Sequence, residues 1–263
     1  MNILDNIILQ KRIEVEKRKA TISISELEIN PFFKRTCYSL TDFLQKEERT
    51  GIIAEYKRKS PSKGIINSSA RVEEVTKAYA KYAAGISVLT DVEFFGGTIA
   101  DLDAARFNEI PILRKDFMIE PFQIIEAKAI GADVILLIAA CLSKNEVKDF
   151  AKLAKSIGLE VLLEIHNEEE LEYICDDVDM VGVNNRNLKT FEVSIETSLQ
   201  LIDQIPNNKL AIAESGISDI KSILTLQEAG FKGFLIGENF MKEPDPAIAF
   251  ARFVQELLKT KMV

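Results

Sequence analysis

The sequence predicts an α/β fold, a (β/α)8 TIM barrel that carries an N-terminal helical extension. From residue 51 onward, eight short β-rich runs alternate with helical segments. The runs are almost continuously apolar, which is typical of parallel strands buried on both faces. A length of 263 residues suits one such barrel. A doubly wound open sheet is the alternative, but its first turn would carry a GxGxxG fingerprint, and this chain has KRKSPSKG there.

Residues 51–263 are expected to form the barrel itself. Segments such as VEEVTKAYAKYAAG and SDIKSILTLQEAG have helical character and separate the runs. Glycines suited to a left-handed helix C-cap stand just before four of the strands, at Gly85, Gly131, Gly158 and Gly230. The expected strands span residues 51–57, 85–91, 111–117, 132–139, 160–166, 180–186, 209–215 and 233–238.

Residues 1–50 differ from the rest and form the expected helical extension of a single catalytic domain. A helical spacing of apolar residues at Ile3, Leu4, Ile7 and Ile8 predicts an amphipathic helix. The charged stretch from Lys11 to Lys19 predicts that its second half is solvated, and a short helix is expected within 40–48. The extension could cover the open bottom or side of the barrel, or it could cap a substrate pocket.

Composition excludes several classes of protein. The formal net charge is −8 and the pI is near 5.0, whereas binding to nucleic acid requires a basic face. The longest apolar run, Val134 to Leu142, is far shorter than the ~20 residues of a membrane span. The N-terminus lacks the pattern of a secretory signal, so a cytoplasmic protein that binds no membrane is expected.

The cysteines and the histidine narrow the chemistry further. Cys37, Cys141 and Cys175 are far apart and form no CxxC, which indicates buried or incidental thiols rather than a disulfide framework or a zinc site. His166 is the single histidine, and no GxSxG motif accompanies it as a catalytic triad would require. A histidine at a strand end is most simply a hydrogen-bonded structural residue.

Charged and polar residues gather at the carboxyl ends of the expected strands, where barrel enzymes place their catalytic groups. Glu55 and Lys57 are two residues apart on the first strand and therefore point the same way. Asp91 and Asp116 could simply cap loops. The other strand ends carry Lys115, Glu164, Asn184 with Arg186, and Glu214 with Ser215. Together these residues predict a functional site at one mouth of the barrel.

Two short stretches suit a phosphate group. Residues 214–217 (ESGI) and 236–239 (IGEN) follow the last two strands, where barrels often bind phosphate through backbone N–H groups and a short helix. Gly216 and Gly237 would allow close approach of the backbone, although they could equally form plain tight turns. The Glu238 side chain is expected to point away from the phosphate while its N–H contributes.

These residues resemble the indole-3-glycerol phosphate synthase family. The resemblance implies the substrate 1-(o-carboxyphenylamino)-1-deoxyribulose 5-phosphate, the products indole-3-glycerol phosphate, carbon dioxide and water, and neither a metal nor an organic cofactor. A monomer or weak homodimer is expected. The matching segments are IIAEYKRKSPSKG (52–64), LTDVEFFGG (89–97), PILRKDFMIEPFQIIEAKAIGAD (111–133), LEVLLEIH (159–166), VGVNNRNLKTFEV (181–193), AESGI (213–217) and GFLIGENFM (233–241).

The resemblance also implies a role for each residue of the mouth. Lys115 would be the general acid for ring closure, and Glu164 a base or an electrostatic partner. Glu55 and Lys57 would form a second pair. Asn184 and Arg186 would position the substrate, with Glu214 and Ser215 lining the same mouth. Phosphate would contact Ser60, Lys57, Gly216, Gly237 and the Glu238 backbone, and the anthranilate ring would contact Phe94, Phe95 and Phe117.

Two other readings stay open at this point. A lysine at the mouth of a phosphate-binding barrel could form a Schiff base with a sugar phosphate, as aldolases do. Alternatively, the chain could be a non-catalytic sensor of a sugar phosphate. The second reading would be favoured if one of the charged pairs were missing, and Glu55, Lys57, Lys115 and Glu164 are all present.

Overall fold

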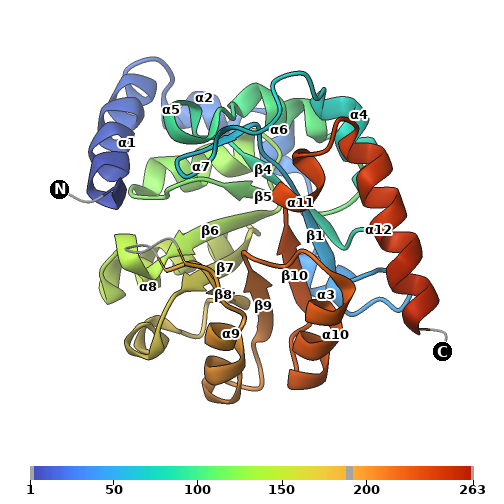
Figure 1. Ribbon diagram of the computed structural model, residues 1–263. Helices are drawn as coiled ribbons and strands as arrows, with labels where there is room; N and C mark the ends of the chain where they lie inside the picture. The colour runs from blue at the N-terminus through green and yellow to red at the C-terminus, as the bar shows by residue number, and fades with distance from the viewer. Residues whose placement is uncertain (1–2, 188–191, 262–263) are drawn as a thin grey trace.

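Eight parallel strands close into a barrel in the computed structural model, which describes residues 3–187 and 192–261 (Figure 1). Around the barrel the order is β1-β10-β9-β8-β7-β6-β5-β4, so each strand lies beside its neighbour in the chain and the last pairs with the first. The eight predicted strands and the (β/α)8 fold class are confirmed. The strands are β1 (Ile52–Tyr56), β4 (Gly85–Leu89), β5 (Ile112–Lys115), β6 (Val134–Ile138), β7 (Glu160–Ile165), β8 (Met180–Asn184), β9 (Leu210–Glu214) and β10 (Gly233–Ile236).

The alternation of side chains along the strands divides the barrel into two apolar regions and one charged mouth. One region lies between the strands and the outer helices and includes Ile52 and Ala54. The barrel interior is a separate apolar cluster that contains Ile53, Leu113, Leu162 and Ile212. Because the period of a strand is two residues, the residue two places after each of these also faces inward. Those residues are Glu55, Lys115, Glu164 and Glu214.

Helices cover the outside of the barrel, and the C-terminal helix α12 packs against α4 (Figure 1). The crossover from β7 to β8 departs from the predicted pattern, because its helical segment is the 3₁₀ helix η3 (Glu168–Tyr173). Asn167 caps η3, and three glutamates occupy its first turn, where the helix dipole favours negative charge. The other helices after the strands are α4 (Val72–Tyr79), α5 (Val92–Phe95), α6 (Ile99–Ala105), α7 (Pro121–Ala129), η2 (Ala139–Cys141), α8 (Lys144–Ser156), α9 (Glu196–Leu201), η4 (Ile202–Gln204), α10 (Ile220–Ala229), α11 (Glu238–Met241) and α12 (Pro246–Lys261).

Three of the four predicted helix-ending glycines adopt the left-handed conformation. Gly131, Gly158 and Gly230 have φ values of 92°, 80° and 118°. The expectation for Gly85 was wrong, because this residue is the first of β4 and has no positive φ. Its small size serves packing instead, since a Cβ there would lie 2.7 Å from Leu40 Cδ1. The glycine pattern therefore marked the strand boundary correctly but for a different physical reason.

The N-terminal extension consists of α1 (Ile3–Lys19), α2 (Ile24–Glu28), η1 (Pro31–Lys34) and α3 (Leu40–Leu44). Helix α3 closes the amino-terminal end of the barrel, because Leu40 and Leu44 join the interior cluster. The Glu160 carboxylate at the start of β7 holds it there, accepting hydrogen bonds from Leu40 N at 2.6 Å and from Ser39 Oγ at 2.7 Å. This part of the extension covers the bottom of the barrel.

The second half of α1 is not wholly solvated, contrary to the prediction. The Lys11 side chain is 1% exposed, and its Nζ lies 2.9 Å from both Asp91 Oδ2 and Asp116 Oδ1. Glu14 contributes a third contact at 2.8 Å. Although burial alone would lower the pKa of Lys11, these carboxylates raise it. A buried charge cluster therefore fastens α1 to the loops that follow β4 and β5.

The loop after β1 contains a small hairpin that the sequence did not predict. Strands β2 (Lys59–Ser60) and β3 (Gly64–Ile65) pair antiparallel. Arg58 anchors the base of the loop, because its guanidinium donates to both oxygens of Asp101 at 2.6 Å. The hairpin holds the segment Ser60 to Lys63 over the carboxyl end of the barrel.

The three cysteines are free, and each is half-buried. Within residues 3–187 and 192–261, the structure contains no helix with the length and apolar character of a membrane span.

Candidate active site

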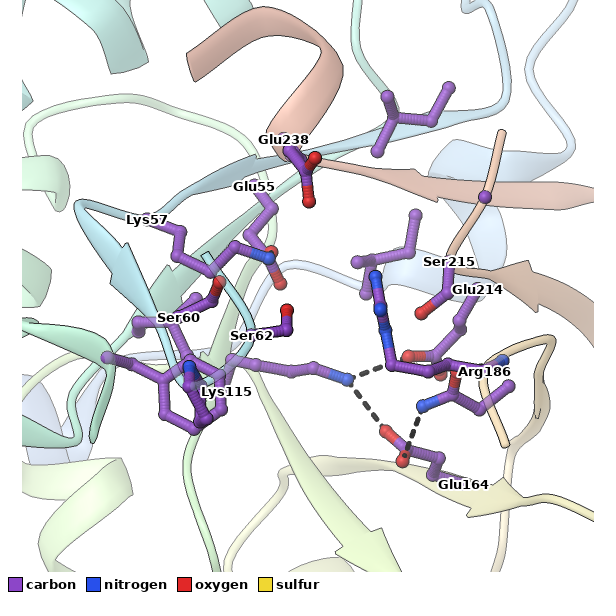
Figure 2. A pocket seen from close by; sticks show the side chains of 18 of the residues that line it. Glu55, Lys57, Ser60, Ser62, Lys115, Glu164, Arg186, Glu214, Ser215 and Glu238 are labelled. Carbon is purple, nitrogen blue, oxygen red and sulfur yellow. Dashed lines mark hydrogen bonds and ion pairs between the residues drawn. The ribbon is translucent and has the colours of Figure 1, made fainter. Parts of the chain in front are cut away.

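A cavity of about 500 Å³ opens at the carboxyl ends of the strands (Figure 2). Its size suits a small organic ligand. The structure brings fourteen of the fifteen predicted site residues to its wall, and Phe94 is not among the lining residues. Those that line it are Glu55, Lys57, Ser60, Lys115, Phe95, Phe117, Glu164, Asn184, Arg186, Glu214, Ser215, Gly216, Gly237 and Glu238.

Lys115 occupies the centre of this wall. Its Nζ donates to Glu164 Oε2 at 2.8 Å and to Glu214 Oε2 at 2.7 Å, across the barrel from β5 to β7 and β9 (Figure 2). The side chains of the two glutamates are 6% and 2% exposed, whereas that of Lys115 is 14% exposed toward the cavity. One ammonium group is thus held between two buried carboxylates and faces the space where a ligand would bind.

The charged groups of this cluster shift one another's pKa values. Burial would lower the pKa of Lys115, but Glu164, Glu214 and Glu55 raise it overall. Burial would raise the pKa of Glu164, but Lys115 and then His166 lower it well below its usual value. For Glu214, burial dominates and, with Glu164 and Glu55 nearby, raises the pKa to about 7 despite Lys115. The two carboxylates on one lysine are therefore unequal.

Glu55 and Lys57 form a second ion pair, as their spacing predicted. Lys57 Nζ lies 2.7 Å from Glu55 Oε1, and both groups border the cavity. Gly237 on the neighbouring β10 makes room for this pair, since a Cβ at Gly237 would lie 2.6 Å from Glu55 Oε1. The glycine is thus required beside Glu55 whatever it also does for a ligand.

Asn184 and the residues after β9 complete the wall. Asn184 Nδ2 donates to Glu164 Oε1 at 2.9 Å, and its Oδ1 accepts the backbone N–H of Arg186. Ser215 is the one described residue other than glycine with a positive φ, at 67°. Asn185 supports that backbone, because its Nδ2 donates to Ser215 O at 3.2 Å. A strained residue braced in this way at a cavity is typical of a functional site.

The residues expected to bind phosphate all line the same cavity, namely Lys57, Ser60, Gly216, Gly237 and Glu238. The short helix α11 begins at Glu238, directly after Gly237. Ser60 Oγ is buried and has no hydrogen-bond partner among the described residues. The Glu238 side chain differs from expectation: it borders the cavity in Figure 2, and its carboxylate lies 4.0 Å from Lys63 Nζ at the rim. Residues 188–191, part of the matching block 181–193, lie outside the described residues.

Several lining residues were missed by sequence reasoning. Ile3, Leu4 and Ile7 of α1 border the cavity, so the extension both covers the barrel bottom through α3 and caps this pocket through α1. Their helical spacing was visible in the sequence, but it could not show which part of the barrel they face. Lys63 and Lys242 also line the cavity. Asp91, by contrast, caps α5 by accepting from Phe94 N and Phe95 N.

His166 lies directly behind the cluster, although it does not line the cavity. Its Nε2 is 3.2 Å from Glu164 Oε1, and its Nδ1 is 3.2 Å from Glu170 Oε2. Over the described residues, no group of three or more His, Cys, Asp or Glu side chains is arranged to hold a metal ion.

The chain is similar to one enzyme family over nearly its whole length. The family model for indole-3-glycerol phosphate synthase matches residues 4–253. Among curated relatives, the indole-3-glycerol phosphate synthase of Bacteroides thetaiotaomicron is 46% identical, over 97% of this chain and 99% of the relative. The enzyme of the same name from Polynucleobacter asymbioticus is 42% identical, over 95% and 98% respectively.

Solved structures of lower identity share the fold. A tryptophan synthase complex from Pyrococcus furiosus contains a chain that is 18% identical with a TM-score of 0.60, covering 80% of this chain and 99% of that one. For 3-hexulose-6-phosphate synthase from Salmonella typhimurium, identity is 14% and the TM-score is 0.61, with coverage of 79% and 98%.

Proposed function

We propose, since the chain belongs to the indole-3-glycerol phosphate synthase family, that it converts 1-(o-carboxyphenylamino)-1-deoxyribulose 5-phosphate into indole-3-glycerol phosphate, carbon dioxide and water. It would then act as a carboxy-lyase in tryptophan biosynthesis. The observation that carries the proposal is the Lys115 ammonium, which two buried carboxylates hold at the wall of a cavity of suitable size.

The reaction requires an acid and a base on one bound molecule. An aromatic ring carbon attacks the ketone carbon, and the carbonyl oxygen must receive a proton as the new bond forms. Loss of carbon dioxide then restores the aromaticity of that ring. Finally the hydroxyl leaves as water while a base removes a proton from the new five-membered ring, which completes the indole. Lys115 is suited to donate the first proton, because it remains an ammonium while its Nζ faces the cavity.

The remaining residues divide the cavity between the two ends of the substrate. Phe95, Phe117 and the α1 residue Ile7 supply an apolar wall for the anthranilate ring. Lys57, with Glu55 beside it, could donate a proton to the departing hydroxyl. Phosphate would bind through Ser60 Oγ and the backbone at Gly216, Gly237 and Glu238. The unpartnered Ser60 Oγ supports this placement.

Two further expectations belong to the same proposal. Three free cysteines suit a reducing, cytoplasmic setting. A monomer or weak homodimer stays a prediction, and sedimentation velocity across a hundredfold range of protein concentration would test it.

The experiment is a fluorescence assay for indole-3-glycerol phosphate with EDTA-treated protein. We expect product from the wild-type protein and a loss of ~10²-fold or more in kcat for Lys115→Ala, the scale of losing a general acid. Lys148→Ala on the outer helix α8 is the matched control and should keep full turnover. A folded wild-type protein that makes no product would overturn the proposal, as would unchanged turnover in Lys115→Ala.

The Schiff-base alternative requires an unprotonated lysine amine as the nucleophile. Carboxylates on either side of Lys115 raise its pKa and oppose that state. Borohydride treatment in the presence of a sugar phosphate should therefore give no adduct at Lys115, and an adduct there would favour the aldolase reading. A sensor would bind the substrate without turning it over.

A further inference from the structure

His166 connects the active-site wall to a carboxylate outside the cavity. Its side chain is 9% exposed and lies just beyond β7, two residues after Glu164. Nε2 lies 3.2 Å from Glu164 Oε1, while Nδ1 lies 3.2 Å from Glu170 Oε2 on η3. Glu170 also accepts the backbone N–H of His166 at 2.7 Å, which fixes the two residues together.

This arrangement suits a protonated imidazole. A neutral ring has one nitrogen that carries a lone pair, and here that lone pair would face a carboxylate oxygen. Only the imidazolium places positive charge between the two carboxylates. Because Nε2 has no aligned hydrogen bond among the described residues, its interaction with Glu164 is an ion pair. Burial would lower the pKa of His166, but Glu164 and Glu170 raise it to about 10. Cys141, which packs close to the same two glutamates, remains neutral because burial raises the pKa of its thiol.

The His166 ring also makes the surroundings of the two glutamates that contact Lys115 different from each other. Lys115 contacts Glu164 and Glu214 at nearly equal distances of 2.8 and 2.7 Å. Glu164 Oε1 has two further contacts, Asn184 Nδ2 at 2.9 Å and His166 Nε2 at 3.2 Å. Glu214 Oε1 is buried with no hydrogen-bond partner among the described residues. It lies against Gly182, where a Cβ would come within 2.1 Å of it.

We infer that His166, held by Glu170, is a positively charged positioning residue that keeps Glu164 ionised and leaves Glu214 as the carboxyl group that exchanges a proton during the reaction. The inference rests on the proposed function. It assigns Glu164 the part of electrostatic partner to Lys115, and it assigns the base to Glu214. Glu214 lines the cavity, and its Oε1 is not held by a hydrogen bond among the described residues, so this carboxyl group is the one placed to take up a proton. Burial, which raises the pKa of Glu214, supports the same assignment.

The charge of His166 can be read directly, because it is the only histidine in the chain. In protein labelled with ¹⁵N-histidine, both ring nitrogens should be protonated at pH 8, and the titration should lie near pH 10. Glu170→Gln should lower that midpoint by about 1 unit or more, since it removes one of two flanking charges. Glu172→Gln is the matched control, because Glu172 lies two residues away on η3 with its side chain 70% exposed and should leave the midpoint unchanged.

The kinetic consequence is tested with His166→Gln, which keeps a polar side chain but removes the charge. We expect kcat to fall ~10-fold or more while KM changes less than about threefold, because His166 touches no substrate. The plot of kcat against pH should show an ionisation near pH 7 in the wild-type protein. In the variant this ionisation should broaden and shift, because the pKa of Glu164 is no longer held far below that of Glu214. A merely structural role would lower kcat without moving the profile.

Two results would overturn the inference. One is a neutral His166 ring at pH 8 in the wild-type spectrum, and the other is a wild-type kcat profile in a folded His166→Gln variant. These outcomes are separate from failure of the proposed function, because the histidine spectrum requires no substrate. A wild-type protein that makes no product while its His166 stays charged would contradict the proposed reaction and leave the charged Glu164–His166–Glu170 bridge standing.

Discussion

Glu164 is the residue on which three active-site contacts converge, from Lys115, Asn184 and His166. Replacing it by Gln removes the charge but keeps the shape. We expect turnover to drop by ~10²-fold or more with a normal circular dichroism spectrum, because the Lys115 ammonium loses its principal counter-charge. Glu168→Gln, an exposed change on η3, is the control. Near-normal turnover in Glu164→Gln would remove Glu164 from the mechanism.

His166 gives a second prediction at the residue scale, concerning pH and stability. Its pKa is about 10 in the folded protein and near 6.5 in an unfolded chain. A raised histidine pKa means that the folded state binds the proton more tightly, so this contribution is complete below pH 6.5 and disappears as pH rises to 10. Urea unfolding at pH 6, 8 and 10 should show a gap between wild type and His166→Gln that narrows with pH. A gap of constant size would contradict it.

The sequence could predict the inward-facing site residues because their position depends on one local rule. Glu55, Lys115 and Glu164 each follow an apolar inward residue by two places on a buried strand, and the pleat places them at the mouth. His166 lies one residue beyond β7 and two places after Glu164, where the sequence alone indicates a structural residue. What that reading lacked was Glu170, which reaches the ring only because η3 turns back over the end of β7.

At the element scale, the attachment of α1 depends on one buried lysine. Lys11→Ala would leave Asp91 and Asp116 buried without their cation, and loss of one partner of a buried ion pair costs about 3 kcal/mol or more. We expect that loss in the free energy of unfolding. Lys17→Ala, an exposed change on α1, should cost less than about 0.5 kcal/mol. Equal effects of the two changes would show that the cluster does not hold the helix.

The elements that the sequence missed are those whose form depends on distant partners. The residues of α1 have a clear helical period, yet the burial of Lys11 depends on carboxylates some eighty and a hundred residues further along the chain. The β2–β3 hairpin has two residues in each strand, too few for a periodic signal, and the Arg58–Asp101 pair anchors it. Tertiary contacts decide such segments.

At the scale of the whole molecule, the topology was predictable because it is built from repeated local signals. Eight buried runs separated by helical segments leave few ways to bury every strand, and a closed parallel barrel satisfies all of them. Gly131, Gly158 and Gly230 mark where helices end. The position of the cavity, at the carboxyl ends of the strands, was predictable. The packing of α1 side chains over the cavity was not, because the periodicity of a helix does not determine where the helix docks.

The sharing of Lys115 between two glutamates has a thermodynamic consequence for the entire fold. Ionised Glu214 destabilises the native state, because folding raises its pKa from 4.5 to about 7. The folded protein therefore loses stability from this group as pH rises from 4.5 to 7. At pH 8, where the group is ionised, Glu214→Gln should relieve this cost. Calorimetry should then show a melting temperature several degrees above that of wild type, and a lower one would mean that the attraction to Lys115 outweighs the burial. A variant that is both inactive and more heat-resistant would show that Glu214 lowers the stability of the fold in exchange for catalytic activity.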